Sequence, residues 1–320
     1  MSHDFKIVML GTSGAGKTCY MLGMYAVMQI GFHGFTITAK DYDQDNELSN
    51  KWQALIEGEG ESRWPAGTDQ PHFYRFNLNY GARPMIEFEW LDYRGGAMSD
   101  QKTENDVQIL RDYLKSSSCI FLCISGEYLK ERDNLGNAVL QAKVGRMNQF
   151  LVDLNQEINP SDDKPFPIVI ILTKYDECKH RQRQELYEDI QKILSSLFTR
   201  KSGWLVTICP VSIFNGKQIA PQNVHHPLFF GIYSNLRQYS LQKNQSSQNH
   251  QSTQSKSGNW LTRITKFGGD KPIETPFGEF TPQVPQTQAD DIQEKLSLLA
   301  QEIKGLQVYL SGEEIKNYYD

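Results

Sequence analysis

The sequence lacks long apolar runs and an excess of positive charge. No stretch of about 18 apolar residues occurs, and the N-terminus has no apolar signal core. These absences argue against a transmembrane segment and a secretory signal, so we expect a cytoplasmic protein. The net charge of −5 gives no support for nucleic-acid binding, which needs a basic face.

Cysteine is scarce, and its placement argues against two of its common uses. The five residues are Cys19, Cys119, Cys123, Cys178 and Cys209. Their number is odd and most lie inside apolar runs, so we expect reduced core residues rather than disulfides. Cys119 and Cys123 have no nearby His or Cys partners, which argues against zinc. The apolar content is ordinary, and 320 residues suffice for one large domain or two small ones.

A phosphate-binding pattern follows the first apolar run. Residues 5–10 read Phe-Lys-Ile-Val-Met-Leu and are of strand type, whereas residues 18–30 are expected to be helical. Between them, residues 11–18 read Gly-Thr-Ser-Gly-Ala-Gly-Lys-Thr and match G-x-x-x-x-G-K-[ST]. The order strand, glycine-rich loop, helix is the context that this motif requires.

The residue types of this loop suit a nucleoside triphosphate. Its glycines allow successive backbone N–H groups to surround a phosphate, and the helix N-terminus adds positive potential. Lys17 can reach the terminal phosphates, and the Thr18 hydroxyl can bind Mg²⁺. The nucleotide-binding residues expected here are Gly11, Ser13, Gly14, Ala15, Gly16, Lys17, Thr18 and Cys19.

Strand and helix patterns alternate over the first 241 residues, which predicts an α/β fold. Residues 73–80 and 85–91 alternate apolar and polar side chains and predict a hairpin. Continuous apolar runs at 119–124, 167–172 and 204–209 predict buried parallel strands. The expected sheet is mostly parallel, with one antiparallel hairpin strand and helices on both faces. Ligands bind such sheets at the carboxyl ends of the strands.

Polar residues follow two of these strands at that edge. Asp92 comes directly after residues 85–91, and a carboxylate there can hold Mg²⁺, usually through water. Gly95 completes Asp-x-x-Gly and lets a backbone N–H approach a γ-phosphate. Thr173-Lys174-Tyr175-Asp176 follows the strand predicted at residues 167–172.

Together these motifs resemble the Ras-like, translation-factor-related (TRAFAC) class of P-loop GTPases over roughly residues 1–241. The resemblance implies the three-layer P-loop NTPase fold, GTP or GDP as ligand and Mg²⁺ as cofactor. In that class [Asn/Thr]-Lys-x-Asp reads guanine, so Asp176 would be the specificity residue, with Lys174 as its support. Thr173 stands where Asn is commoner. Ser212 lies where the last guanine-binding loop of the class would be.

The resemblance also implies a switch threonine that contacts Mg²⁺. Thr68 is the best match, because the stretch from Trp64 to Thr68 is similar to one before the hairpin in bacterial members of the class. Thr36 and Thr38 are alternatives. The catalytic residues expected are Lys17, Thr68 and Gly95, and the metal-binding residues expected are Thr18, Thr68 and Asp92.

Hydrolysis is expected to be slow. Ras-like members orient the attacking water with a Gln just after Asp-x-x-Gly, and Gly96 in that position cannot do so. A group that replaces this Gln could come from Arg63 or Arg94, although we interpret both first as solvated surface residues. A protein partner could also supply it. The expected function is a guanine-nucleotide switch that signals to a protein effector or activator through loops near Thr68 and residues 92–96. An ATP-using P-loop protein and a non-hydrolysing nucleotide-binding scaffold remain alternatives.

The composition changes after residue 241, where the expected GTPase domain (1–241) ends. Residues 242–290 are rich in Gln and Ser and then in Pro, and are expected to form a disordered linker. Residues 291–310 carry apolar side chains at heptad spacing, which predicts an amphipathic helix within the C-terminal segment 291–320. This helix either docks on its own domain or associates with a partner.

Overall fold

The computed structural model describes residues 5–65, 71–93, 104–131, 136, 140, 143–254, 274–275, 278–279 and 288–319. The chain divides into two units. One unit comprises Met1–Asn235 and Leu299–Asp320, and the other comprises Leu236–Leu298. The C-terminal residues therefore belong to the same unit as the predicted phosphate-binding loop.

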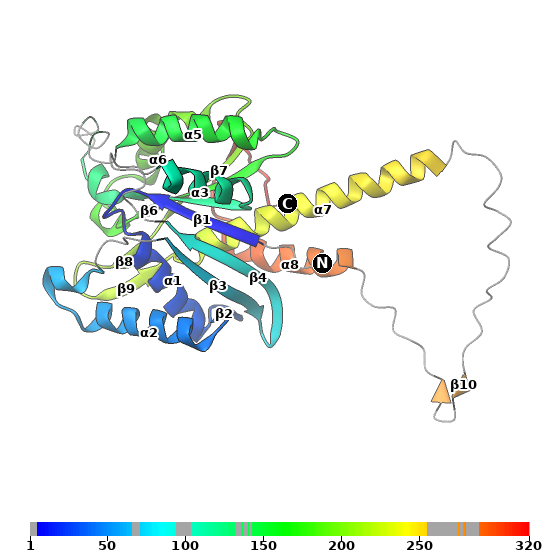
Figure 1. The fold of residues 1–320 in the computed structure, drawn as a ribbon, viewed down its shortest axis with the longest axis horizontal. Coiled ribbons are helices and arrows are strands. Elements are labelled where there is room, and N and C mark those ends of the chain that lie inside the picture. The colour runs from blue at the N-terminus through cyan, green and yellow to red at the C-terminus, as the bar shows by residue number, and fades with distance from the viewer. Residues whose placement is uncertain are drawn as a thin grey trace. The chain divides into compact units, whose positions relative to one another are not determined.

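A nine-stranded mixed sheet runs through the first unit, in the order β13-β12-β7-β6-β5-β1-β4-β3-β2 (Figure 1). Its parallel part consists of β7 (Trp204–Pro210), β6 (Phe166–Thr173), β5 (Cys119–Ser125), β1 (Phe5–Gly11) and β4 (Arg83–Asp92). In β5, β6 and β7 nearly every residue is buried, because helices cover both faces of the sheet. The expected α/β class and mostly parallel sheet are confirmed.

The antiparallel part is larger than the sequence predicts. The expected hairpin is present as β3 (His72–Tyr80) and β4, and β2 (Phe35–Ala39) adds a second antiparallel pairing to β3. At the opposite edge, β12 (Val308–Leu310) pairs antiparallel with β7, and β13 (Glu313–Glu314) pairs antiparallel with β12. The expectation of one antiparallel hairpin strand was therefore wrong, because short strands extend both edges.

Helices pack on both faces of the sheet (Figure 1). On one face, a single apolar core joins the strands to α3 (Glu104–Lys115), α5 (Val144–Ile158) and α6 (Arg183–Ile193). On the other face lie α1 (Lys17–Ile30) and the first part of α7 (His226–Gln254). Gly231 of α7 approaches β5 so closely that a Cβ there would lie 3.2 Å from the Phe121 ring.

The helix before the hairpin is longer than its apolar pattern suggests. Its apolar residues begin at Leu48, but α2 (Tyr42–Glu57) begins six residues earlier. The side chain of Asp41 accepts a hydrogen bond of 2.8 Å from the Gln44 backbone N–H, which caps the helix N-terminus. A short 3₁₀ helix, η1 (Gly60–Arg63), follows α2.

The C-terminal segment differs from its predicted course. The helix expected over residues 291–310 ends earlier, since α8 spans Gln288–Ile303 and the chain continues as β12. The turn from β12 to β13 has Ser311 and Gly312 with φ of 50° and 80°, as a tight two-residue hairpin turn requires. Leu299 and Ile303 are buried, which favours docking of this part of α8 on its own domain.

The predicted linker also differs in part from expectation. The linker was expected to begin at residue 242, but α7 is helical to Gln254. Most of the remainder of residues 242–290 lies outside the described residues, apart from β10 (Glu274–Thr275), β11 (Gly278–Glu279) and the start of α8.

Two compositional expectations can be compared with the structure. The cysteines are unpaired, and Cys119, Cys123, Cys178 and Cys209 are buried core residues as expected, whereas Cys19 is half-buried. Within the described ranges, no helix has both the length and the apolar character needed to cross a membrane.

Candidate functional site

The loop between β1 and α1 depends on glycine where the backbone turns. A Cβ on Gly11 would lie 2.7 Å from the carbonyl oxygen of Cys123 on β5, closer than real Cβ atoms approach. Gly16 has a φ of 77° and immediately precedes α1. In such a left-handed conformation an L side chain is strained, so glycine fits both positions. Inside the loop, the Ala15 N–H donates to the Thr12 carbonyl at 3.2 Å.

Lys17 folds back over the loop. It is buried, and its Nζ donates to the carbonyl oxygens of Gly11 and Thr12, each at 3.1 Å. Burial lowers the pKa of the Lys17 ammonium, and the nearby Cys123 and Asp92 partly oppose that shift. A buried cation whose hydrogen bonds within the described part of the chain go to carbonyl oxygens is well placed to attract an anion.

Thr18 and Asp92 form a polar pair at the start of α1. The Thr18 hydroxyl donates to Asp92 Oδ2 at 3.1 Å, and Asp92 at the end of β4 is only 1% exposed. Its other oxygen, Oδ1, has no hydrogen-bond partner among the described residues. Burial raises the pKa of Asp92, and Lys17 and the Thr18 hydrogen bond oppose the shift. An unsatisfied buried carboxylate oxygen of this kind suits a cation or its bound water.

The Thr18 hydroxyl and the Asp92 carboxylate provide too few oxygens for a cation coordinated by protein alone, but they suit Mg²⁺. The described residues contain no group of three or more His, Cys, Asp or Glu side chains able to hold a metal. Mg²⁺ typically takes one or two protein ligands and completes its shell with water and substrate phosphates. The Thr18–Asp92 pair beside the phosphate-loop motif matches that requirement.

Thr173 fastens the loop to the end of β6. Its buried hydroxyl lies 2.7 Å from the Ala15 carbonyl oxygen and 3.0 Å from that of Ile124, and can donate to either. The bond to Ala15 joins residues 158 positions apart in the chain. Thr173 thus provides a side-chain tether to the loop even though the residue commoner at this position is Asn.

Lys174 and Asp176 project from the turn after Thr173. Lys174 has a φ of 49° and precedes the 3₁₀ helix η5 (Tyr175–Glu177). Its ammonium pairs with Glu127 at 2.8 Å, and this hydrogen bond lowers the pKa of Glu127. Asp176 is half-buried, and burial raises its pKa. The Tyr175 N–H donates to the Val211 carbonyl at 3.1 Å, which fixes the turn against the segment after β7.

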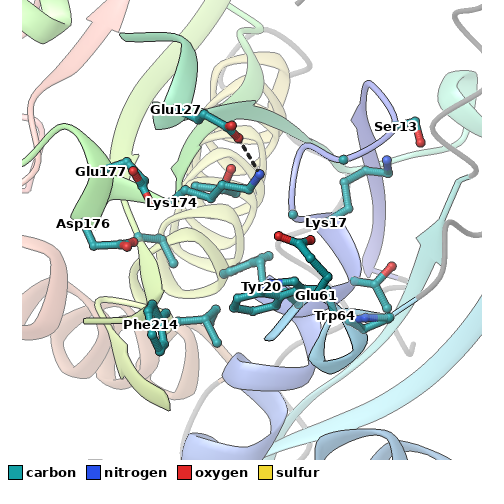
Figure 2. A pocket seen from close by; sticks show the side chains of 18 residues that line it. Ser13, Lys17, Tyr20, Glu61, Trp64, Glu127, Lys174, Asp176, Glu177 and Phe214 are labelled. Atoms are coloured by element: carbon teal, nitrogen blue, oxygen red, sulfur yellow. Dashed lines mark hydrogen bonds and ion pairs between the residues drawn. The ribbon is translucent and has the colours of Figure 1, made fainter. Parts of the chain in front are cut away.

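One cavity of about 370 Å³ brings together the phosphate-loop motif and the turn after Thr173, whereas Asp92 is connected to it through Thr18, which lines it (Figure 2). Nine of the residues predicted to bind nucleotide line it: Ser13, Gly14, Gly16, Lys17, Thr18, Cys19, Thr173, Lys174 and Asp176. The other predicted residues lie next to this lining. Gly11 and Ala15 accept hydrogen bonds through their carbonyls, and Ser212 is buried between Val211 and Ile213, both of which line the cavity.

The cavity also has a wall that contains none of the predicted site residues. Glu61, Trp64 and Pro65 come from η1 and the residues after it, and Ile213 and Phe214 come from β8 (Ser212–Phe214). The strand β8 forms a hairpin with β9 (Ile219–Gln222). The rings of Trp64 and Phe214 meet edge to face, with centroids 6.1 Å apart. The available signal was Trp64 itself, a large aromatic residue within an otherwise polar loop.

Two of the predicted catalytic residues, Thr68 and Gly95, lie outside the described residues. Arg94, a candidate for a missing catalytic group, and Gly96 lie outside them as well. The alternative threonines, Thr36 and Thr38, lie on the edge strand β2, where they pair with Asn79 and Asn77.

Arg63, a candidate for a catalytic cation, makes structural contacts instead. Its Nε donates to the Gly58 carbonyl at 2.8 Å. Its guanidinium carbon lies 5.6 Å from the centre of the Phe214 ring. These contacts connect Arg63 to Phe214 of the cavity wall, although Arg63 itself does not line the cavity.

Comparison with models of known protein families and with the curated proteins gave no match for this chain. The functional argument therefore depends on the residues and geometry of the cavity.

Proposed function

We propose that this chain is a guanine-nucleotide-binding switch protein of the Ras-like, translation-factor-related class, with slow Mg²⁺-dependent GTP hydrolysis. The observation that carries the proposal is the single cavity that contains both the phosphate-loop motif and Asp176. Thr173 couples the two through its hydrogen bond to Ala15. A nucleotide needs such a site, with donors for phosphates at one end and acceptors for its base at the other.

Lys17 would hold the terminal phosphates. Its ammonium is already buried, so its desolvation cost is met before ligand arrives. Exchanging the Gly11 and Thr12 carbonyls for phosphate oxygens replaces neutral acceptors with charged ones, and charge-assisted hydrogen bonds are roughly twice as strong. The backbone N–H groups of the loop would add further donors without moving.

Thr18 and Asp92 would hold Mg²⁺. When bound, the ion neutralises charge that develops on the transferring phosphoryl group. Asp92 Oδ1 lacks a partner among the described residues and can accept a hydrogen bond from a metal-bound water. The Thr18 hydroxyl contributes a second oxygen, and its hydrogen bond to Asp92 orients both groups before binding.

Asp176 would select the base. Its carboxylate can accept hydrogen bonds from the N1–H and the amino group of guanine. Adenine cannot offer that pair, so its binding would leave a partly desolvated carboxylate unpaired. The aliphatic part of Lys174 would lie against the base, and the Glu127 ion pair holds its ammonium at the cavity wall.

The proposal includes slow turnover and a cytoplasmic switch role. Gly96 has no side chain with which to orient water, so hydrolysis would depend on positioning alone or on a group from a partner. The loops near Thr68 and residues 92–96 would order around the γ-phosphate and present a surface to a protein effector or activator. Because Leu299 and Ile303 of α8 are buried, association with a partner through α8 would use its other residues.

Equilibrium titration of the purified chain with GTP and ATP in the presence of Mg²⁺ tests this function. We expect GTP to bind at least about a hundredfold more tightly than ATP, because a site built around two specific hydrogen bonds discriminates strongly. Equal or tighter binding of ATP would favour the ATP-using alternative and reject the guanine assignment.

A further inference from the structure

Glu61 brings a carboxylate into the cavity from the segment between α2 and β3. Figure 2 shows this carboxylate directed into the space between Lys17 and Lys174. It therefore lies between the phosphate loop and the turn that carries Asp176. Neither the phosphate-binding motif nor the Thr-Lys-x-Asp motif includes it.

The turn that carries Glu61 is closed by contacts within its own segment. A Cβ on Gly58 would lie 2.7 Å from Arg63 Cα, so glycine is needed for this close approach. Arg63 Nε donates to the Gly58 carbonyl at 2.8 Å, and the Trp64 N–H donates to the Glu61 carbonyl at 3.3 Å. The segment is thus a defined turn that places Glu61 at the cavity.

Aromatic contacts hold this turn against the cavity. The Trp64 ring meets Phe214 edge to face, and the Arg63 guanidinium lies over the same Phe214 ring. Phe214 belongs to the hairpin that follows Val211, whose carbonyl is bonded to the Asp176 turn through Tyr175 N–H. Glu61 and Asp176 are therefore positioned by one connected set of contacts.

Charge decides which part of a nucleotide Glu61 can face. Beside the phosphates a carboxylate would repel like charge, and Lys17 already serves that end. At the base, Asp176 already supplies the acceptor. A nucleotide that spans from Lys17 to Asp176 places its ribose between them, and ribose offers neutral hydroxyl donors. A carboxylate that accepts from hydroxyls makes charge-assisted hydrogen bonds.

We propose that Glu61 accepts hydrogen bonds from the ribose hydroxyls and makes the site selective for ribonucleotides. The inference rests on the proposed function, because it takes the direction of the bound nucleotide from Lys17 and Asp176. It assigns to the segment between α2 and β3 a role in sugar recognition.

The test compares GTP with 2′-deoxy-GTP, 3′-deoxy-GTP and 2′,3′-dideoxy-GTP by equilibrium titration of the full chain with Mg²⁺. The wild type should bind GTP about tenfold more tightly than the dideoxy analogue, the effect of one hydrogen bond to a charged acceptor. Glu61→Ala should bring this ratio close to one, and Glu61→Gln, which retains an acceptor oxygen, should give an intermediate ratio. The monodeoxy analogues identify the hydroxyl involved.

Glu59→Ala is the matched control. Glu59 is an exposed acid two residues away that does not line the cavity, so this variant should keep the wild-type ratio. The ratio is the appropriate readout, because removing either negative charge strengthens the binding of all triphosphates alike. Thermal unfolding of each variant confirms that it is folded.

Three outcomes would overturn the inference. Wild-type protein that binds GTP and its dideoxy analogue equally would overturn it, as would an undiminished preference in Glu61→Ala. In both cases the guanine site would stand. Failure of every guanine nucleotide to bind would reject the proposed function and this inference together.

Discussion

Replacing Thr173 with Val tests whether the tether between β6 and the phosphate loop couples stability to nucleotide binding. Valine has nearly the same shape as threonine but removes the hydroxyl, which lies 2.7 Å from the Ala15 carbonyl oxygen and 3.0 Å from that of Ile124. Because Thr173 is only 4% exposed, water cannot easily replace the lost donor. The variant therefore isolates one buried hydrogen-bond donor.

The expected loss of stability follows from leaving buried carbonyls with one donor fewer. A buried polar group without its partner costs about 1–3 kcal/mol. For a unit of this size, each kcal/mol lowers the unfolding temperature by roughly 2–4 °C, so a loss of about 2 kcal/mol lowers it by roughly 4–8 °C. Nucleotide affinity should also fall, because the loop that surrounds the phosphates loses its link to the Lys174–Asp176 turn.

Thr207→Val provides a control that separates the two effects. Thr207 is fully buried and its hydroxyl donates to the Gln307 carbonyl at 2.8 Å, in the contact between β7 and the chain entering β12. This variant should lose similar stability but bind GTP with wild-type affinity. Thermal unfolding and GTP titration of both variants give the comparison. Unchanged stability and affinity in Thr173→Val, or equal loss of affinity in both variants, would refute the tether argument.

Three further predictions concern the phosphate end of the cavity. Lys17→Ala should abolish nucleotide binding while circular dichroism shows a retained fold, and unchanged affinity would reject the site assignment. Burial raises the pKa of Asp92 above its ordinary value of 3.8. Between pH 3.8 and the raised pKa, the folded protein without ligand therefore holds more protons than the unfolded chain, and its stability falls as the pH rises through this range. Asp92→Asn should remove this loss, so the variant should be more stable than the wild type at neutral pH without ligand. It should also bind nucleotide with less dependence on Mg²⁺. Parallel pH profiles of unfolding for the variant and the wild type would contradict this prediction. Because Gly96 cannot orient water, phosphate release by the chain alone should be slower than about 10⁻³ s⁻¹, and faster release would show that another group orients the water.

Local patterns predicted the central sheet well. The runs that form β5, β6 and β7 are apolar throughout because both faces of these strands are buried, so composition alone identifies them. The loop after β1 was equally predictable, because its glycines and Lys17 must be adjacent in sequence to act together. Thr173, Lys174 and Asp176 could be placed near this loop because parallel strands end at a common edge.

Features that depend on distant contacts were missed. Leu306 and Leu310 continue the heptad spacing of α8, and only the pairing with β7 reveals Val308–Leu310 as a strand. Glu61 and Phe214 are 153 positions apart in the numbering and meet at one cavity through backbone turns that no periodic pattern encodes. The extra edge strands and the unpredicted cavity wall therefore share one cause, which is long-range packing of short segments.

The central claim, that Asp176 reads guanine in the cavity that also contains the phosphate loop, is tested most directly by Asp176→Asn. The carboxylate can accept two hydrogen bonds from guanine, whereas an Asn amide has one acceptor and would direct its NH₂ donors at the amino group of the base. Xanthine carries a carbonyl in place of that amino group and accepts from the amide. Titration of both proteins with GTP and xanthosine triphosphate should show GTP affinity falling at least about a hundredfold in the variant while affinity for xanthosine triphosphate rises. A variant that keeps wild-type affinity for GTP and gains none for xanthosine triphosphate would contradict the claim.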